Sequence, residues 1–495
     1  MRKIKAILRP SVIAAALIIA ALYAFGHPVY ADESGVQAEE IDINIIPANN
    51  ESTAKLKDGS YSTSITFTKD NPITITPKDE ADKIYGLYVI WAAVPGEWTL
   101  KVDNGEISCG GNAFLHEYIE IKGGSSSAVI TLPQQEKICD IKAYSEGELP
   151  ADVQVWKPAC DKADIMLLST HADDEILFFG GILPEYAGER GLNVQLVYFS
   201  NYFGGTVIRE HEKLDGLWNA GVRNYPVNGD FPDEYADNLE AAKKLYGYDE
   251  TLSFVVSQIR RFKPQICVAQ DTDGEYGHGT HMLTSAAMQE AVTVSMDEAV
   301  YPESAVQYGI WDVPKTYIHL YKENAIELDC RKPLSKFGGS TALEVASESY
   351  KKHVSQQWCW FYVSDTYEYS IAKFGLCRTT CGADTGNDMM ENLISYAEQE
   401  RLEKEKREAE EASRAAEEAK RKAEEESREK AEYEHRYGVP KGESAPGKVS
   451  SFLKNIGITI VCMVIFSIIL LFIGSFVRRK AIQRKRRKKR RKSNK

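Results

Sequence analysis

Cysteine is scarce in this chain: nine cysteines are spread over 495 residues. Their spacing matches no zinc ribbon, and none stands in the context of a catalytic nucleophile, so we expect neither a thiolate metal site nor thiol chemistry. Cys377 and Cys381 form the one close pair, and Cys109 with Cys139 is a second candidate disulfide for an exported protein. Isolated buried thiols are an equal alternative.

Acidic residues are missing from both ends of the chain. Residues 1–31 carry four basic residues and residues 478–495 carry thirteen, with no Asp or Glu in either segment. The remainder has 43 basic and 72 acidic residues. A surface this acidic repels polyanions, so the sequence predicts no nucleic-acid partner.

Long apolar runs are confined to the same two ends. Residues 1–31 have a basic start followed by an apolar stretch, which predicts a secretory signal peptide cleaved after Ala31, with an uncleaved anchor as the alternative. Residues 456–477 contain no charge and are long enough to form a transmembrane helix. The basic block in residues 478–495 predicts a cytoplasmic tail, and a nucleic-acid-binding arm is the weaker interpretation. We therefore expect a single-pass protein of the cell membrane whose main part lies outside the cell.

Residues 40–156 contain short runs of alternating apolar and polar side chains, divided by Gly, Asn, Asp and Pro. This pattern predicts an all-β sandwich or jelly roll. Residues 137–156 resemble the closing strands of galactose-binding-like domains. The resemblance implies glycan binding, and a spacer packed on the next domain is an equal alternative.

Between residues 160 and 385, apolar runs of strand length alternate with helical patterns. Strands are expected at 165–169, 194–200, 266–269 and 315–320, and helices at 175–188, 210–220, 251–262 and 281–294. This alternation predicts an α/β, Rossmann-like domain with a largely parallel sheet and helices on both faces. Ligands of such folds bind beyond the carboxyl ends of the strands.

Residues 391–436 have almost no large apolar side chains but many alternating charges. A packed coiled coil needs apolar a and d positions, so we expect a solvated helical stalk of roughly 70 Å instead. Residues 437–455 contain Gly and Pro and would link this stalk to the predicted transmembrane helix.

Two short motifs carry the chemistry of the α/β domain. The first is HADDE at residues 171–175, after the strand predicted at 165–169, and the second is HGTH at residues 278–281, after a turn-forming stretch. Each alone is a weak signal, because acids after a strand often begin a helix and an HxxH pair is often structural. Glu175 is expected to begin a helix in this way, with orientation of His171 as the alternative. Together, the two motifs predict a hydrolytic metal site.

Neutral histidine and aspartate are ligands that zinc accepts, and a catalytic zinc site keeps one position open. We therefore expect His171, Asp174 and His281 to hold one divalent metal ion, Zn²⁺ or another. Asp173 would act as the general base. His278 would stabilise the oxyanion of the intermediate or protonate the leaving amine.

Three stretches look like the signature regions of the PIG-L (LmbE-like) de-N-acetylase family: LLSTHADDEILFFGG, TVIREHEKLDGLWNAGV and IRRFKPQICVAQDTDGEYGHGTHMLTSAAMQEA. The resemblance covers residues 163–375. It implies a metal-dependent, usually zinc-dependent hydrolase that removes N-acetyl groups from glucosamine-containing substrates or related amides. By position it implies the same three metal ligands and the same base. It adds Tyr276 as a mobile helper near the carbonyl and Arg209 as a substrate-binding residue, for which a solvated charge is the alternative.

The chain departs from the family pattern at two places. Ala172 stands where the family has Pro, and Gly279-Thr280 replace Pro-Asp. Neither change removes a ligand or the base, so activity is still expected. Thr280 lacks a carboxylate that could support His278, which would affect the rate and the pH optimum.

Residues 349–357 resemble the late substrate-side segment of the family, and Trp358, Trp360, Phe361 and Tyr362 follow. These four side chains are predicted to belong to a packed core strand, and an aromatic wall for a sugar ring is the alternative.

The sequence thus predicts a zinc-dependent de-N-acetylase at the cell surface, anchored in the membrane by one C-terminal helix and acting on an N-acetylated sugar or glycan. Two alternatives stay open. One is a glycan-binding surface protein with a vestigial hydrolase domain, and the other is a metal-dependent amidase for a different N-acyl substrate.

Overall fold

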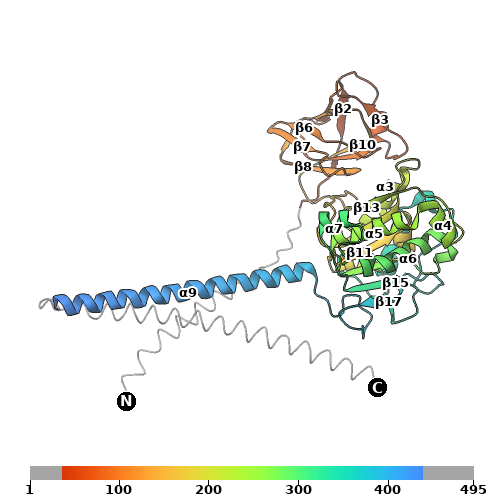
Figure 1. Cartoon of the computed structure of the whole chain (residues 1–495). Coiled ribbons are helices and arrows are strands. Elements are labelled where there is room, and N and C mark those ends of the chain that lie inside the picture. Colours follow the sequence, from red (N-terminus) through yellow and green to blue (C-terminus); the bar gives the residue numbers. More distant parts are fainter. Residues whose placement is uncertain (1–35, 439–495) are drawn as a thin grey trace, which may run out of the picture. The chain divides into compact units, whose positions relative to one another are not determined.

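The structure of the chain, a computed structural model, describes residues 36–438 (Figure 1). The predicted signal peptide, transmembrane helix and basic tail lie outside the described residues, as does nearly all of the predicted linker. Within the described part, no helix combines the length and the apolar character needed to cross a bilayer. One compact unit ends at Glu403 and a second begins at Lys404.

The N-terminal part of the first unit consists of two five-stranded antiparallel sheets. Their inward side chains form one apolar core, in which Ile75 and Leu100 of one sheet pack with Leu87 and Ile141 of the other. This arrangement confirms the prediction of a β-sandwich fold. The first sheet contains β1 (Glu40–Ile41), β10 (Glu136–Tyr144), β5 (Ile84–Trp91) and β8 (His116–Ser125), with β3 (Ile65–Phe67) paired to β10. The second contains β2 (Ile43–Pro47), β4 (Ile73–Pro77), β9 (Ala128–Thr131), β6 (Trp98–Val102) and β7 (Gly105–Cys109).

A seven-stranded mixed sheet forms the centre of the following α/β part. Its order is β13 (Val227–Phe231), β12 (Val194–Ser200), β11 (Ile165–Ser169), β14 (Ile266–Ala269), β15 (Lys315–His319), β17 (Lys373–Thr379) and β16 (Ala325–Glu327). The first five strands are parallel, as predicted, whereas β17 pairs antiparallel with both β15 and β16. The antiparallel edge was not foreseen. The carboxyl ends of β11 and β14 lie side by side, because these strands are parallel neighbours.

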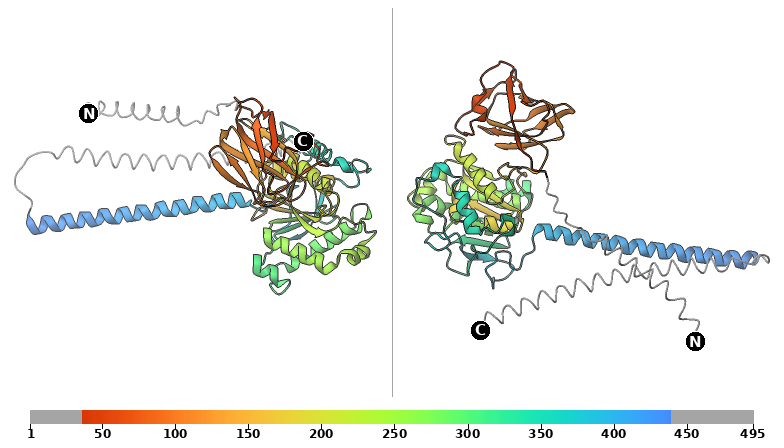
Figure 2. Two further views of the ribbon diagram at one scale, coloured as in Figure 1. Left: turned by 90° about the horizontal axis from the view of Figure 1, so that it is seen from above. Right: turned by 180° about the vertical axis from the view of Figure 1, so that it is seen from behind.

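Helices cover both faces of this sheet (Figures 1 and 2). On one face α5 (Tyr248–Phe262) and α6 (Gly279–Val294) pack on Met166 and Leu168 of β11. On the other face α2 (Asp174–Leu177), α3 (Ile208–Asn219) and α8 (Ala342–Tyr350) pack on Leu167. Before residue 396, the other helices and short turns are α4 (Leu239–Tyr246), α7 (Pro302–Tyr308), η1 (Ala54–Lys57), η2 (Leu183–Glu189), η3 (Glu275–Gly277), η4 (Ser335–Phe337) and η5 (Val354–Gln356).

The continuous helix predicted over residues 175–188 is wrong. The structure has α2, then turns, and then the π-helical segment η2. The break follows from close packing at Gly180 and Gly181. A Cβ at Gly180 would lie 2.5 Å from the carbonyl oxygen of Ile176, and one at Gly181 would lie 2.4 Å from that of Ile371.

Strand β8 of the sandwich and helix α3 of the α/β part meet through buried polar side chains. His116 Nε2 lies 2.8 Å from His211 Nδ1, and the ring of Tyr61 stacks on His211 at 4.5 Å. Tyr61 also donates to Asp215 of α3, at 2.8 Å. We call these four residues the junction cluster. Because Arg209 lies in the first turn of α3, this contact ties the sandwich to an element that borders the predicted site.

All eight cysteines of the described part are free thiols. The two candidate disulfides are therefore wrong, and the alternative of isolated thiols holds. Cys109 and Cys139 are each buried in the sandwich, where burial raises the thiol pKa to about 12. The long helix α9 (Tyr396–Tyr437) has exposed side chains from Glu400 onward.

Candidate metal centre and pocket

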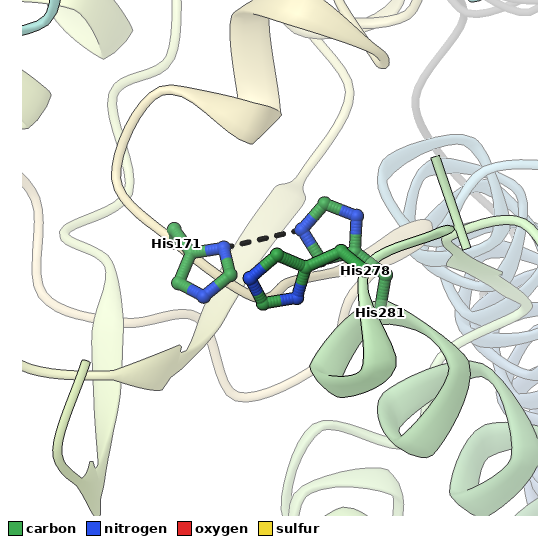
Figure 3. Close-up of side chains that lie close together, drawn as sticks. All are labelled: His171, His278 and His281. Carbon is green, nitrogen blue, oxygen red and sulfur yellow. Dashed lines mark hydrogen bonds between the residues drawn. The ribbon is translucent and has the colours of Figure 1, made fainter. Parts of the chain in front are cut away.

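The two predicted motifs meet at the carboxyl ends of β11 and β14. His171 follows β11, while His278 and His281 stand at the start of α6, and one ring nitrogen from each lies within 4.8 Å of the others (Figure 3). His171 Nδ1 and His281 Nε2 are 3.1 Å apart. The parallel pairing of β11 with β14 thus brings together residues that are distant in the chain.

Asp174 completes a tighter triangle than the three histidines alone. Its Oδ2 lies 3.1 Å from His171 Nδ1 and 3.2 Å from His281 Nε2. Ligand atoms around a tetrahedral zinc ion, each about 2.0–2.2 Å from the metal, are about 3.3–3.6 Å apart. Three donor atoms at nearly this spacing therefore fit one divalent cation. We call His171, Asp174, His278 and His281 the pocket cluster.

The charges around His281 also favour a cation. Burial alone would lower the pKa of His281, but the carboxylates of Asp174 and Glu275 outweigh burial and raise it to about 10. Burial would raise the pKa of Asp174, but His281 and His171 hold it well below its usual range. The carboxylates beside His281 therefore stabilise positive charge on its ring.

A second layer of residues, which the sequence analysis missed, holds the predicted ligands. Glu275 accepts hydrogen bonds from His281 Nδ1, at 2.8 Å, and from His319 Nδ1, at 2.6 Å. Gln270 donates to Asp174 Oδ2, at 2.9 Å. Such partners fix the ring orientation of a metal-binding histidine. His319 ends β15, the neighbour of β14, so the rule that ligands gather at strand ends could have found it.

Asp173 lies in a strained turn just outside the triangle. Its φ is 126°, a conformation that favours glycine. Burial, with a further contribution from the neighbouring charge of Asp174, raises its pKa to about 8, and Arg209 opposes this shift. Its backbone N–H donates to Glu175 Oε2, at 2.7 Å. Glu175 therefore supports Asp173 rather than His171, and its second carboxylate oxygen lies 2.9 Å from His353 Nε2.

Arg209 is drawn into the site and is not a solvated charge, since its side chain is only 12 % exposed. Its guanidinium donates to Asp233 and to the carbonyl oxygen of Ala172, each at 2.6 Å, and lies 3.4 Å from Asp173 Oδ1. It also covers the ring of Tyr202, at 4.2 Å from the ring centroid. Asp233, another residue that the sequence analysis missed, lies 3.5 Å from His171 Nε2.

His278 caps α6 with its imidazole. Its Nδ1 accepts the backbone N–H of Thr280, at 3.2 Å, so the neutral ring carries its proton on Nε2. Burial, followed by the charges of His281 and His171, lowers its pKa to about 2. This hydrogen bond keeps Nδ1 unprotonated, whereas a carboxylate would accept a proton from that nitrogen.

The departure at Gly279 has a steric reason. A Cβ there would lie 2.3 Å from the carbonyl oxygen of Asn238, and the Gly279 N–H donates to the carbonyl oxygen of Ala236, at 2.8 Å. Proline has no N–H to donate, and its Cβ would clash with the carbonyl oxygen of Asn238. The loop after β13, which carries Asp233 and Tyr235, is thereby fastened to the turn that carries His278.

A pocket of about 180 Å³ opens beside these residues. Its wall includes Asp173, Arg209, Tyr276 and His278 together with Trp358 and Phe361. Tyr276 also has a positive φ, of 48°, and packs on Phe361 at 4.6 Å between ring centroids.

The core strand predicted for residues 358–362 is wrong. This segment has no strand, and Trp358 is 83 % exposed. The alternative, an aromatic wall beside the site, agrees with the lining of the pocket.

Residues 166–292 match the family model described as PIG-L: GlcNAc-PI de-N-acetylase. The chain contains a PIG-L family domain. Curated relatives include 1D-myo-inositol 2-acetamido-2-deoxy-alpha-D-glucopyranoside deacetylases. The protein from Rhodococcus erythropolis is 26% identical over 193 residues, which is 33% of this chain and 63% of the relative. The protein from Geodermatophilus obscurus is 33% identical over 178 residues, which is 31% of this chain and 60% of the relative.

This chain therefore spans about three fifths of the length of these two relatives. Among solved structures, the N,N'-diacetylchitobiose deacetylase from Pyrococcus horikoshii is similar at 17% identity, with a TM-score of 0.31, over 39% of this chain and 71% of that chain. A conserved protein from Thermus thermophilus, TT1542, is similar at 18% identity, with a TM-score of 0.29, over 39% of this chain and 80% of that chain.

Proposed function

We propose that the chain is a zinc-dependent de-N-acetylase that hydrolyses the acetamide of a glucosamine-type sugar outside the cell. The observation that carries the proposal is the triangle of His171, Asp174 and His281, with Asp173 and His278 beside it at the wall of one pocket. The PIG-L domain and the names of the curated relatives support the reaction and the sugar. The apolar and basic pattern of residues 1–31 supports export, and that of residues 456–495 supports attachment to the membrane.

Zinc suits the two imidazole nitrogens and one carboxylate oxygen of the triangle. Bound there, a zinc ion would lower the pKa of a water molecule and polarise the acetamide carbonyl. Glu275 and Gln270 keep the ligand side chains in place before the substrate enters.

The residues around the triangle divide the proton transfers between them. Asp173 takes a proton from the attacking water while the oxygen of that water bonds to the carbonyl carbon. The Nε2–H of His278 donates a hydrogen bond to the negative charge that develops on the carbonyl oxygen. When the C–N bond breaks, Asp173 returns the proton to the leaving amine, and acetate and the free amino sugar are released. His278 remains neutral throughout, because the Thr280 amide occupies its Nδ1.

Acetate release by the purified full chain tests the proposal. The substrates are N-acetylglucosamine, chitooligosaccharides, peptidoglycan fragments, glycolipid head groups and N-acyl amides without sugar. We expect about one zinc ion per chain and release from the sugars. Asp173→Asn should lower kcat by about 10²–10⁴-fold and keep the metal. A chain that binds no metal and releases no acetate would refute the proposal, and turnover of the sugar-free amides alone would change its substrate.

A further inference from the structure

Large aromatic side chains stand exposed next to the pocket. In the segment after η5, Trp358 is 83 % exposed and Trp360 is 65 % exposed, and Tyr362 follows at 53 %. Folded proteins bury most of the surface of tryptophan. Exposed aromatic rings gathered at one place are typical of a binding surface.

Side-chain hydrogen bonds hold the segment that carries these rings in place. Gln357 Nε2 donates to the carbonyl oxygens of Tyr350 and His353, at 2.9 and 3.1 Å. The hydroxyl of Tyr350 lies 3.1 Å from Cys359 Sγ. The rings are therefore presented by an anchored segment.

A row of packed rings joins this segment to Tyr276 in η3. Tyr276 packs on Phe361, at 4.6 Å between centroids, and Phe361 packs on Trp360, at 4.1 Å. Trp358 and Phe361 line the pocket itself. We call Trp358, Trp360 and Phe361 the aromatic platform. Two of its members thus line the pocket, and the third, Trp360, packs on Phe361.

The size and charge of the pocket limit what this platform can meet. A volume of about 180 Å³ is below the roughly 300–1,000 Å³ of pockets that enclose a drug-sized ligand, so further units of a larger substrate must lie outside it. Among the described residues that line the pocket, Arg209 is the sole Arg or Lys, and Asp173 and Asp233 already engage it. Nothing in this lining is left to select a phosphate group.

We propose that the aromatic platform binds the sugar units next to the one whose acetamide is cleaved, so that the substrate is an extended, uncharged N-acetylated glycan. Sugar rings have apolar C–H faces that stack on aromatic rings, and each added unit would cover ring surface that is now exposed. This inference rests on the proposed function and adds the class of substrate to it.

Chain-length dependence tests this inference. The kcat/KM of the zinc-loaded full chain is measured with N-acetylglucosamine, its dimer and its hexamer. We expect it to rise with length, and Trp358→Ala and Trp360→Ala should each reduce the ratio of hexamer to monomer about tenfold. Trp360→Phe should restore part of that ratio. Tyr433→Ala removes an aromatic side chain that is 64 % exposed on α9, and it should leave the ratio as it is.

Binding gives a second readout that does not depend on turnover. Calorimetric titration of Asp173→Asn with the hexamer should show affinity that Trp360→Ala, added to this variant, weakens about tenfold. Equal kcat/KM for all lengths, with no effect of either tryptophan, would overturn the inference while acetate release kept the proposed function. If no acetate were released but the hexamer still bound in a tryptophan-dependent way, the proposed function would fail and the binding role of the aromatic platform would remain. Binding of phosphoinositide vesicles in place of the hexamer would overturn the inference and point to a lipid head group.

Discussion

Residues 36–438 hold two buried groups of histidines, and only one of these two has the geometry of a metal site. In the pocket cluster, Asp174 and two histidines direct three donor atoms at one point. In the junction cluster, His116 and His211 bind each other. The remaining ring nitrogen of His116 is taken by the hydroxyl of Tyr88, at 3.0 Å.

The carboxylates make the difference between the two clusters. Asp215 comes no closer than 4.0 Å to His116, and Tyr61 and Gln154 already donate to it. Burial there lowers the pKa of both histidines, that of His211 to about 4. In the pocket cluster the acids reverse this effect and raise the pKa of His281. Histidines that lie close together are thus not enough: a carboxylate at the same point turns a neutral packing contact into a cation site.

Removing one carboxylate from each cluster should have very different effects on metal binding. We expect Asp174→Asn to lose the metal ion and to lower acetate release by about 10³-fold or more, because an anionic ligand is gone. Asp215→Asn should keep the metal and most of the activity. Elemental analysis after dialysis and an acetate assay check both variants. Equal metal loss in the two variants, or metal retained by Asp174→Asn, would contradict this account of the pocket cluster.

A milder change tests the layer behind the predicted metal ligands. Glutamine at residue 275 can accept from only one of the two histidines that Glu275 now supports, and its amide N–H₂ would face the other. We therefore expect Glu275→Gln to weaken zinc binding about 10–100-fold in a competition titration with a chelator. Glu212→Gln is the matched control, since Glu212 is also buried but accepts from Ser355. If both variants bound zinc like the wild type, Glu275 would have no part in holding His281.

Local sequence patterns predict some features of the fold and the site, whereas features that depend on long-range contacts escape them. The parallel strands were predictable, as was the meeting of the residues after β11 with those at the start of α6, because strand ends of one sheet edge must converge. Glu275 was hidden inside a stretch that looks like an ordinary turn. Its role depends on His319 of β15, and the pairing of β15 with β14 is a long-range contact.

Other features depend on packing that no local pattern encodes. The helix expected at 175–188 is broken because backbone carbonyls approach Gly180 and Gly181. Residues 358–362 have the aromatic composition of a core strand. Composition alone cannot distinguish a buried aromatic side chain from one that is presented to a ligand. The junction cluster likewise needs β8 and α3 to meet before His116 reaches His211.

The junction cluster should make a small contribution to the pH dependence of the free energy of unfolding. Burial lowers the pKa of His211 to about 4 in the folded chain, against about 6.5 when unfolded. Between these values the unfolded chain binds more protons, so this histidine makes the free energy of unfolding fall as the pH drops from 6.5 towards 4. Asp215 acts in the opposite sense, because burial raises its pKa to about 6 and its folded form gains a proton first.

Removing His211 isolates its share of this pH dependence. In His211→Gln the fall in unfolding free energy between pH 7 and 5 should be smaller than in the wild type, by on the order of 2 kcal/mol. Asp215 and the other acids are present in both proteins, so their contributions largely cancel in the difference. Urea unfolding at each pH measures it, and His435→Gln on the exposed surface of α9 should reproduce the wild-type profile. Parallel profiles for His211→Gln and the wild type would mean that the junction cluster admits a charged imidazole, and the contrast with the pocket cluster would then lie in geometry alone.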